Sequence, residues 1–199
     1  MLLTPTILLE AYRRGIYPMG DPGSHRIDWH APDPRAILPL ESFHTPRSLV
    51  RVCRSQRFEV VSDRDFEAVI DGCAARAPTW ITPPMRSGYL RLHRAGHAHS
   101  VEAWRDGRLV GGLYGVHVGG AFMGESMFHR ATDASKVCLV ALVMALRRRG
   151  FVLLDVQAMT AHLMRFGAVL IPRQSYQQRL SRAIELAATW AAGPMPVEV

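Results

Sequence analysis

Three polar side chains stand in apolar segments of the kind that form buried strands. Glu125 belongs to GESMF, and Asp155 and Gln157 belong to DVQ, where strand alternation places both on one face. Burying an unpaired charge costs several kcal/mol, so such groups need either partners or a chemical purpose. Carboxyl groups in such surroundings often carry proton chemistry in active sites. The spacing alone leaves two interpretations open, a catalytic centre and a satisfied buried hydrogen-bond network.

Other catalytic chemistries are not indicated. His97 and His99 form a close pair, but no third ligand stands at the spacing of a zinc site. Ser126 stands in GESMF, which differs from the GxSxG turn of serine hydrolases, so covalent serine catalysis is not expected. The three cysteines are widely separated and lack a CxxC pair. We therefore expect no metal, no cofactor and no disulfide framework.

The chain is strongly basic. Its 199 residues include 24 Lys and Arg against 17 Asp and Glu, a net charge of +7. Lys136 is the one lysine, and arginine binds phosphate bidentately and stacks on bases. A nucleic-acid partner is one explanation of this composition, and a GC-rich genome, which encodes Arg in place of Lys throughout, is the other. The longest apolar stretch is too short to cross a bilayer and no secretory signal is evident, so we expect a cytoplasmic protein.

Proline usage suggests how the chain is divided. Prolines gather in GIYPMGDPG and WHAPDPRAILPLESFHTPR and predict a loop-rich N-terminal region. We place a boundary near residue 57, giving a small domain at 1–57 and a larger one at 58–199. Hydrophobic periodicity predicts the elements of the larger domain. They are a strand at 57–61, helices at 63–74 and 86–97, three antiparallel strands at 99–105, 108–118 and 121–128, a helix at 134–149, strands at 151–157 and 167–172, and a helix at 173–189.

This order predicts an α+β fold and matches the layout of GNAT-type acyltransferases, an analogy at the level of fold. Members that use coenzyme A carry a glycine-rich turn that cradles pyrophosphate at a helix N-terminus. The corresponding connection here reads GESMFHRATDASK and contains one glycine. Coenzyme A is therefore disfavoured as the acyl donor.

The chain resembles the bacterial leucyl/phenylalanyl-tRNA-protein transferases over roughly residues 8–180. The motifs occur in family order as AYRRGIYPM, PDPRAIL, TWIT, GHAHSVE, LVGGLYGV, GESMF, ASK, DVQ and GAVLIPR. The resemblance implies a small N-terminal domain followed by a GNAT-like acyltransferase domain. It also implies transfer of leucine or phenylalanine, with methionine as a further candidate, from aminoacyl-tRNA to proteins that begin with Arg or Lys. The modified protein would then be degraded.

The resemblance also assigns roles to residues. Asp155 and Gln157 match the pair at the reacting amine, and Glu125 matches the glutamate beside the aminoacyl ester. Because a carboxamide is no Brønsted base near neutral pH, we expect Gln157, oriented by Asp155, to align the amine as a hydrogen-bond acceptor. The apolar lining of the aminoacyl pocket would be Leu113, Phe122, Leu139, Leu142 and Leu154. The tRNA 3′ end and the acceptor would meet Tyr12, Met19, Trp80 and Tyr89.

Six arginines are candidates for contacts to tRNA phosphates, which carry no sequence information. They are Arg86, Arg91, Arg94, Arg147, Arg148 and Arg149.

The chain departs from the family pattern at three positions. Met19 and His30 stand where much of the family has Trp, which leaves the acceptor preference open. Leu142 stands where some relatives have Phe, which would reshape selection between leucine and phenylalanine. Two other functions compete with aminoacyl transfer. One is N-acetyltransfer from an acyl-CoA, and the other is a non-catalytic tRNA-binding module.

Overall fold

The computed structural model describes residues 2–24, 26–75 and 77–197. Helices and strands are interspersed along the chain, and the described strands form two sheets. The elements are α1 (Pro5–Arg13), β1 (Tyr17–Gly20), β2 (Ile27–His30), β3 (Arg35–Ile37), α2 (Arg47–Arg54), β4 (Glu59–Ser62), α3 (Phe66–Ala74), α4 (Pro83–Arg94), β5 (Ala98–Arg105), β6 (Arg108–Val118), β7 (Ala121–His129), α5 (Ala134–Arg148), β8 (Leu153–Gln157), α6 (Ala161–Met164), β9 (Val169–Ile171), α7 (Arg173–Ile184) and β10 (Gly193–Pro194).

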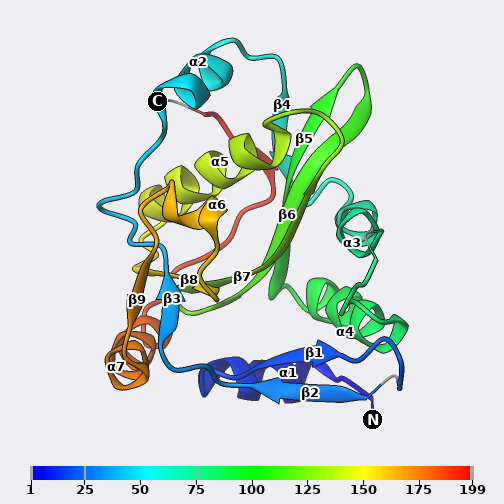
Figure 1. The fold of residues 1–199 in the computed structure, drawn as a ribbon, viewed down its shortest axis with the longest axis vertical. Helices are drawn as coiled ribbons and strands as arrows, with labels where there is room; N and C mark the ends of the chain where they lie inside the picture. The colour runs from blue at the N-terminus through cyan, green and yellow to red at the C-terminus, as the bar shows by residue number, and fades with distance from the viewer. Residues whose placement is uncertain (1, 25, 76, 198–199) are drawn as a thin grey trace.

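The large sheet has eight strands in the order β10-β4-β5-β6-β7-β8-β3-β9, and β1 pairs with β2 in a separate hairpin. The predicted meander is confirmed, because β5, β6 and β7 pair antiparallel in sequence order. Helix α5 covers one face of the sheet, whereas α3 and α4 lie against the other (Figure 1). Each face has its own hydrophobic core. The fold is therefore mixed α and β, with a layer of helices on each side of the sheet.

Helix α5 is apolar around most of its circumference, as predicted, and eleven of its fifteen residues are buried. Arg147 and Arg148 lie in its last turn, where the helix dipole favours cations. The helix predicted at 86–97 begins earlier, at Pro83, because proline is pre-organised for the first helical turn. The final helix ends at Ile184, five residues before the predicted end. Among the described residues, no helix is both long and apolar enough to span a membrane.

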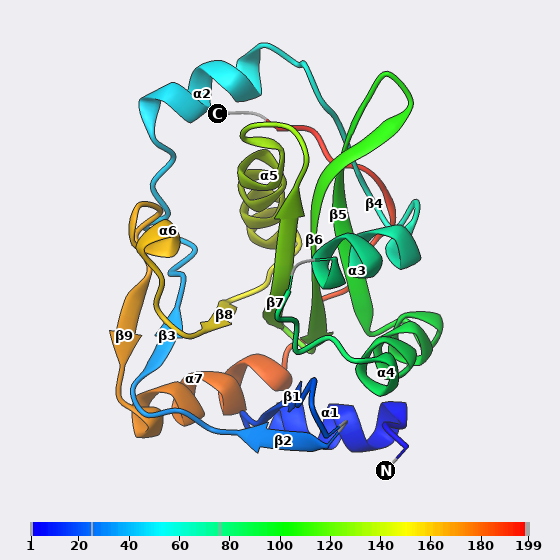
Figure 2. The same cartoon turned by 45° about the vertical axis from the view of Figure 1, so that its right-hand side comes forward.

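The N-terminal region is more regular than its prolines predict. It contains two helices, the β1–β2 hairpin and β3, which pairs with both β8 and β9 inside the large sheet. The large sheet therefore takes strands from both sides of residue 57. A separate small domain at 1–57 stays a prediction. The β1–β2 hairpin and α1 lie together beside α4 and α7 (Figures 1 and 2).

Candidate active site

A pocket opens where β7 and β8 diverge. The two strands pair in parallel from Ala121 and Leu153 to Met123 and Asp155, after which β7 continues away from β8 (Figure 2). The cavity between them measures about 600 Å³. Its lining includes Tyr17, Met19, Trp80, Leu113, Tyr114, Glu125, His129, Ser135, Lys136, Leu139, Leu142, Leu154, Val156, Gln157, Thr160, His162 and Leu163.

Glu125 reaches this site through a β-bulge. Gly115 pairs with Gly124 and Tyr114 pairs with Ser126, so Glu125 is the extra residue of β7. A bulge of this kind breaks the alternation of side chains and re-aims the extra one. The carboxylate of Glu125 accepts hydrogen bonds from the hydroxyls of Tyr12 and Tyr89, each at 2.8 Å. The strand pattern in the sequence does not show this bulge.

The surroundings of Glu125 favour its protonated form. Burial raises the pKa of Glu125 to about 7, against the lowering effect of the two tyrosine hydroxyls. The number of available protons supports the same conclusion, because the hydroxyl oxygens of Tyr12 and Tyr89 also lie 2.7 Å apart. The three contacts of this ring need three protons, and the two phenols supply two. A protonated Glu125 supplies the third, and in that form it donates to one of the two tyrosine oxygens instead of accepting from both hydroxyls.

Replacing Glu125 by Gln is therefore expected to change how stability depends on pH. The pKa of Glu125 lies above its ordinary value of 4.5, so the folded protein keeps a proton that the unfolded chain releases. Its stabilising contribution is full below about pH 4.5 and is lost as the pH rises through about 7. Relative to E125Q, the wild-type free energy of unfolding should fall by about 1–3 kcal/mol over this range.

Urea unfolding of both proteins at several pH values measures this difference and cancels the other titrating groups. A difference that does not change with pH would show that Glu125 titrates normally.

Asp155 is buried against a cation rather than facing the pocket. Arg35 from β3 donates to both of its oxygens, at 2.9 and 2.7 Å, and Tyr176 from α7 donates at 2.7 Å. The side chain of Arg35 is 1% exposed and also donates to the carbonyl of Gly15. Asp155 is thus fully paired, and neither Arg35 nor Tyr176 was predicted as its partner. The signal was present, because Arg35 stands at the start of the apolar run AIL.

Gln157 lines the pocket and contacts both carboxyl groups. Its main-chain N–H donates to Asp155 at 2.9 Å, and its Nε2 donates to Glu125 at 2.8 Å. Gln157 has a φ of +65°, a conformation that non-glycine residues rarely adopt. Since Nε2 is held by Glu125 and no described residue is hydrogen-bonded to Oε1, the Oε1 atom can accept a hydrogen bond from a ligand. Only Gln157 belongs to the pocket lining, so the two side chains do not both reach the cavity.

The expected apolar lining is largely assembled. Leu113, Leu139, Leu142 and Leu154 line the pocket together. Phe122 is fully buried and is not among the lining residues. Its ring stacks on Trp190 with centroids 5.4 Å apart. Phe122 therefore packs outside the pocket lining, where it stacks on Trp190 near the end of the chain.

Of the aromatic positions, Trp80 lines the pocket beside Met19. The β1–β2 hairpin carries Met19, and it is held beside Trp80 because the N–H of Gly20 donates to the carbonyl of Trp80. A Cβ at Gly20 would come within 2.7 Å of that carbonyl oxygen, so this approach requires glycine. His30 stacks on Tyr17 at 5.7 Å, so a ring is still present where much of the family has Trp.

Tyr12 and Tyr89 do not offer a surface to a ligand. Both rings are buried, at 1% and 0% exposed, and neither is among the lining residues. Their hydroxyls hold Glu125 instead. Direct contact with the tRNA 3′ end or the acceptor would require these rings to move.

The six predicted phosphate-binding arginines lie outside the pocket lining. Arg86 is paired with Glu67 and Asp71, which offsets its charge. Arg147 donates to the carbonyl of Leu40, and Arg149 lies over the ring of Trp190. Arg91 donates to the carbonyl of Leu3, whereas Arg94 and Arg148 are exposed. Their contact with tRNA stays a prediction.

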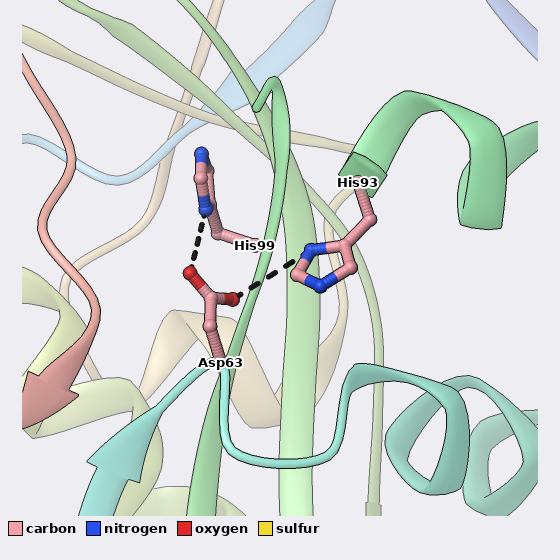
Figure 3. Close-up of side chains that lie close together, drawn as sticks. All are labelled: Asp63, His93 and His99. Atoms are coloured by element: carbon pink, nitrogen blue, oxygen red, sulfur yellow. Dashed lines mark hydrogen bonds and ion pairs between the residues drawn. The ribbon is translucent and has the colours of Figure 1, made fainter. Parts of the chain in front are cut away.

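A second polar cluster lies away from the pocket. Figure 3 shows the side chains of Asp63, His93 and His99 pointing toward one another. Their ligand-type atoms lie within 4.8 Å of one another. Asp63 already accepts hydrogen bonds from His99 at 2.8 Å and from the indole of Trp190 at 2.9 Å. Nδ1 of His93 lies 2.8 Å from the carbonyl oxygen of Ala98. A metal would have to displace these bonds, which fasten the C-terminal segment to β5.

Comparison with known proteins identifies relatives across most of the chain. Residues 37–181 match the model of the leucyl/phenylalanyl-tRNA protein transferase family, and residues 1–33 match the model of its N-terminal domain. Proteins named leucyl/phenylalanyl-tRNA–protein transferase are similar in sequence. The one from Rubrobacter xylanophilus is 56% identical, covering 94% of this chain and 97% of its own. The one from Salinibacter ruber is 53% identical, covering 94% and 83%.

A solved structure shows a weaker likeness. It is the C-terminal domain of a putative lysylphosphatidylglycerol synthetase from Agrobacterium fabrum, 14% identical, with a TM-score of 0.40 over 96% of this chain and 63% of that one. That likeness is too low to assign a fold. The sequence relationship is decisive, because identity above 50% extends over nearly the whole chain. The chain belongs to the leucyl/phenylalanyl-tRNA protein transferase family.

Proposed function

We propose that this protein transfers leucine or phenylalanine from aminoacyl-tRNA to the N-terminal α-amine of proteins that begin with Arg or Lys. Besides membership of the family, one structural observation supports this proposal. Gln157 is held by Glu125 at the edge of a pocket whose other wall is built from leucines. This arrangement supports a role for Gln157 as the acceptor that aligns the amine, beside an apolar site for the aminoacyl side chain.

The reaction needs positioning more than chemical activation. An aminoacyl-tRNA is an activated ester, and an α-amine with a pKa of about 7.7–8.0 is partly neutral near physiological pH. The amine nitrogen attacks the ester carbon, the bond to the ribose oxygen breaks, and the amine proton passes to that leaving oxygen. Oε1 of Gln157 accepts from the attacking amine and aligns it. Asp155 acts through the backbone N–H of Gln157, since its carboxylate is neutralised by Arg35.

The β1–β2 hairpin supports a basic acceptor. Asp28 lies directly opposite Met19 in the hairpin, so the two side chains share a face. Met19 lines the pocket, and the side chain of Asp28 is 54% exposed, with Arg26 at 4.0 Å. A guanidinium or ammonium group at the pocket mouth can pair with this carboxylate.

The GNAT-like arrangement and the small N-terminal domain belong to the same proposal. The divergence of β7 and β8 beside α5 supports the GNAT-like comparison. The separate family match at 1–33 supports a distinct N-terminal unit. N-acetyltransfer from an acyl-CoA is not favoured by the family match.

A transfer assay tests the proposal. Labelled leucine on tRNA is offered to three peptides that are identical except for a first residue of Arg, Lys or Asp. We expect label on the Arg and Lys peptides, and none on the Asp peptide or on an N-acetylated Arg peptide. Absence of transfer to every peptide would reject the proposed activity, whereas equal transfer to all three free N-termini would reject only the acceptor preference.

A further inference from the structure

The pocket has a cationic end that the proposed mechanism does not use. Lys136 lines the cavity, together with His129 and His162. No arginine is among the described residues that line it. Nε2 of His162 is buried and has no hydrogen-bond partner in the described part of the chain. Burial lowers the pKa of His162, and Lys136, Arg165 and His129 lower it further, which shows that these side chains lie close together.

The same end of the pocket contains the start of α5. Asp133 precedes the helix, and its side chain makes no capping hydrogen bond to the first turn. Ser135 lines the pocket although it is only 4% exposed. Helix N-termini bind anions, because unpaired N–H groups and the helix dipole both favour negative charge.

A glycine allows α5 to begin at this place. A Cβ on Gly111 of β6 would lie 2.6 Å from the Cβ of Ala134 and 3.1 Å from the nitrogen of Ser135. Any side chain at position 111 would push the first turn of α5 away from the sheet. The close approach therefore helps to place Ser135 and Lys136 at the pocket.

The residues of α5 that line the pocket change along the helix from apolar leucines to the cationic Lys136. Leu142, Leu139 and Ser135 follow one another on the face that lines the cavity, and Lys136 adjoins the last of them. Seven residues of helix rise by about 10 Å, so the apolar and cationic ends lie about that far apart. An aminoacyl adenosine has the same polarity, with an apolar side chain on one side of the ester and a 5′ phosphate beyond the ribose.

We propose that Lys136 and the first turn of α5 bind the phosphate that joins the last two nucleotides of the donor tRNA. This inference rests on the proposed function and adds the site that anchors the 3′ end. Nζ of Lys136 contacts Asp133 at 2.7 Å and has two further protons to donate. Asp133 would repel a phosphate, but Arg57 lies 3.3 Å from its carboxylate and offsets part of that charge.

Two minimal donors test this site, 2′(3′)-O-leucyl-adenosine and the same compound with a 5′ phosphate. With wild-type protein and an Arg-initiated peptide, we expect the phosphate to lower the donor KM about tenfold with little change in kcat. Lys136→Met should abolish this advantage, so that the KM becomes the same for the phosphorylated and the unphosphorylated donor. Remaining transfer from the unphosphorylated donor is the control for folding. Arg182→Gln removes one exposed charge from α7, outside the pocket lining, and should keep the advantage.

The outcomes separate this inference from the activity on which it rests. If wild-type protein transfers leucine from neither these donors nor Leu-tRNA, the proposed function fails. If transfer occurs but the 5′ phosphate gives no advantage, or if K136M keeps the advantage, the phosphate site is rejected. A K136M protein that loses activity equally with both donors would also reject it, because the lysine would then act on something other than the phosphate.

Discussion

Replacing Arg35 by Met should lower the free energy of unfolding by about 3–5 kcal/mol, because it leaves the Asp155 carboxylate buried without its cation. Asp155 is 0% exposed, and two of its hydrogen bonds come from Arg35. The bond from Tyr176 and the N–H of Gln157 would persist but carry no formal positive charge. Urea unfolding at neutral pH measures the loss.

A double variant separates the buried charge from the packing of the arginine. Arg35→Met with Asp155→Leu removes both charges, so it should recover much of the stability lost in R35M. Arg148→Met is the matched control, because Arg148 is exposed and its replacement should change stability by less than about 0.5 kcal/mol. If R35M is as stable as R148M, the ion pair does not hold Asp155 in place.

Replacing Gln157 by Ala should lower kcat for leucine transfer at least tenfold, with the donor KM nearly unchanged. In the proposed mechanism Oε1 aligns the amine, and the substitution leaves the lining leucines and Lys136 intact. A loss of alignment costs rate rather than binding. Steady-state transfer from Leu-tRNA to an Arg-initiated peptide gives both constants.

Two further variants control for the unusual backbone of Gln157. Alanine is strained at a φ of +65°, whereas asparagine tolerates it, so Gln157→Asn keeps the backbone and shortens the amide. Q157N should therefore be as slow as Q157A while unfolding closer to wild type. Gln177→Ala, which removes a side chain bonded to the carbonyl of Arg14, should leave the rate unchanged. A wild-type rate in Q157N and Q157A would remove Gln157 from the mechanism.

Local patterns in the sequence were sufficient for the elements that frame the site. The meander of β5, β6 and β7 follows from alternation and from turns at Asp106-Gly107 and Gly119-Gly120. Helix α5 follows from a continuous apolar run that ends in arginines. These signals are local, because each depends on residues only a few positions apart.

The contacts of the aromatic side chains could not be predicted in the same way. Trp80 precedes α4 and Tyr89 lies in the middle of it, yet Trp80 lines the pocket and Tyr89 is buried and bonded to Glu125. The difference arises from which part of the β1–β2 hairpin and of β7 packs against each ring. Family motifs located both residues near the pocket, but they did not distinguish a ring that lines the cavity from one that holds Glu125.

Sequence patterns were sufficient to predict the family, the residue types proposed for the reacting centre and the need of a buried carboxylate for a partner. The identity of that partner depends on tertiary contacts, because Arg35 lies 120 positions from Asp155. Tertiary contacts also form the bulge that turns Glu125 toward two tyrosines, and they bring Lys136 into the lining of the pocket. Strand register, bulges and burial are set by contacts between distant segments, and no local pattern encodes them.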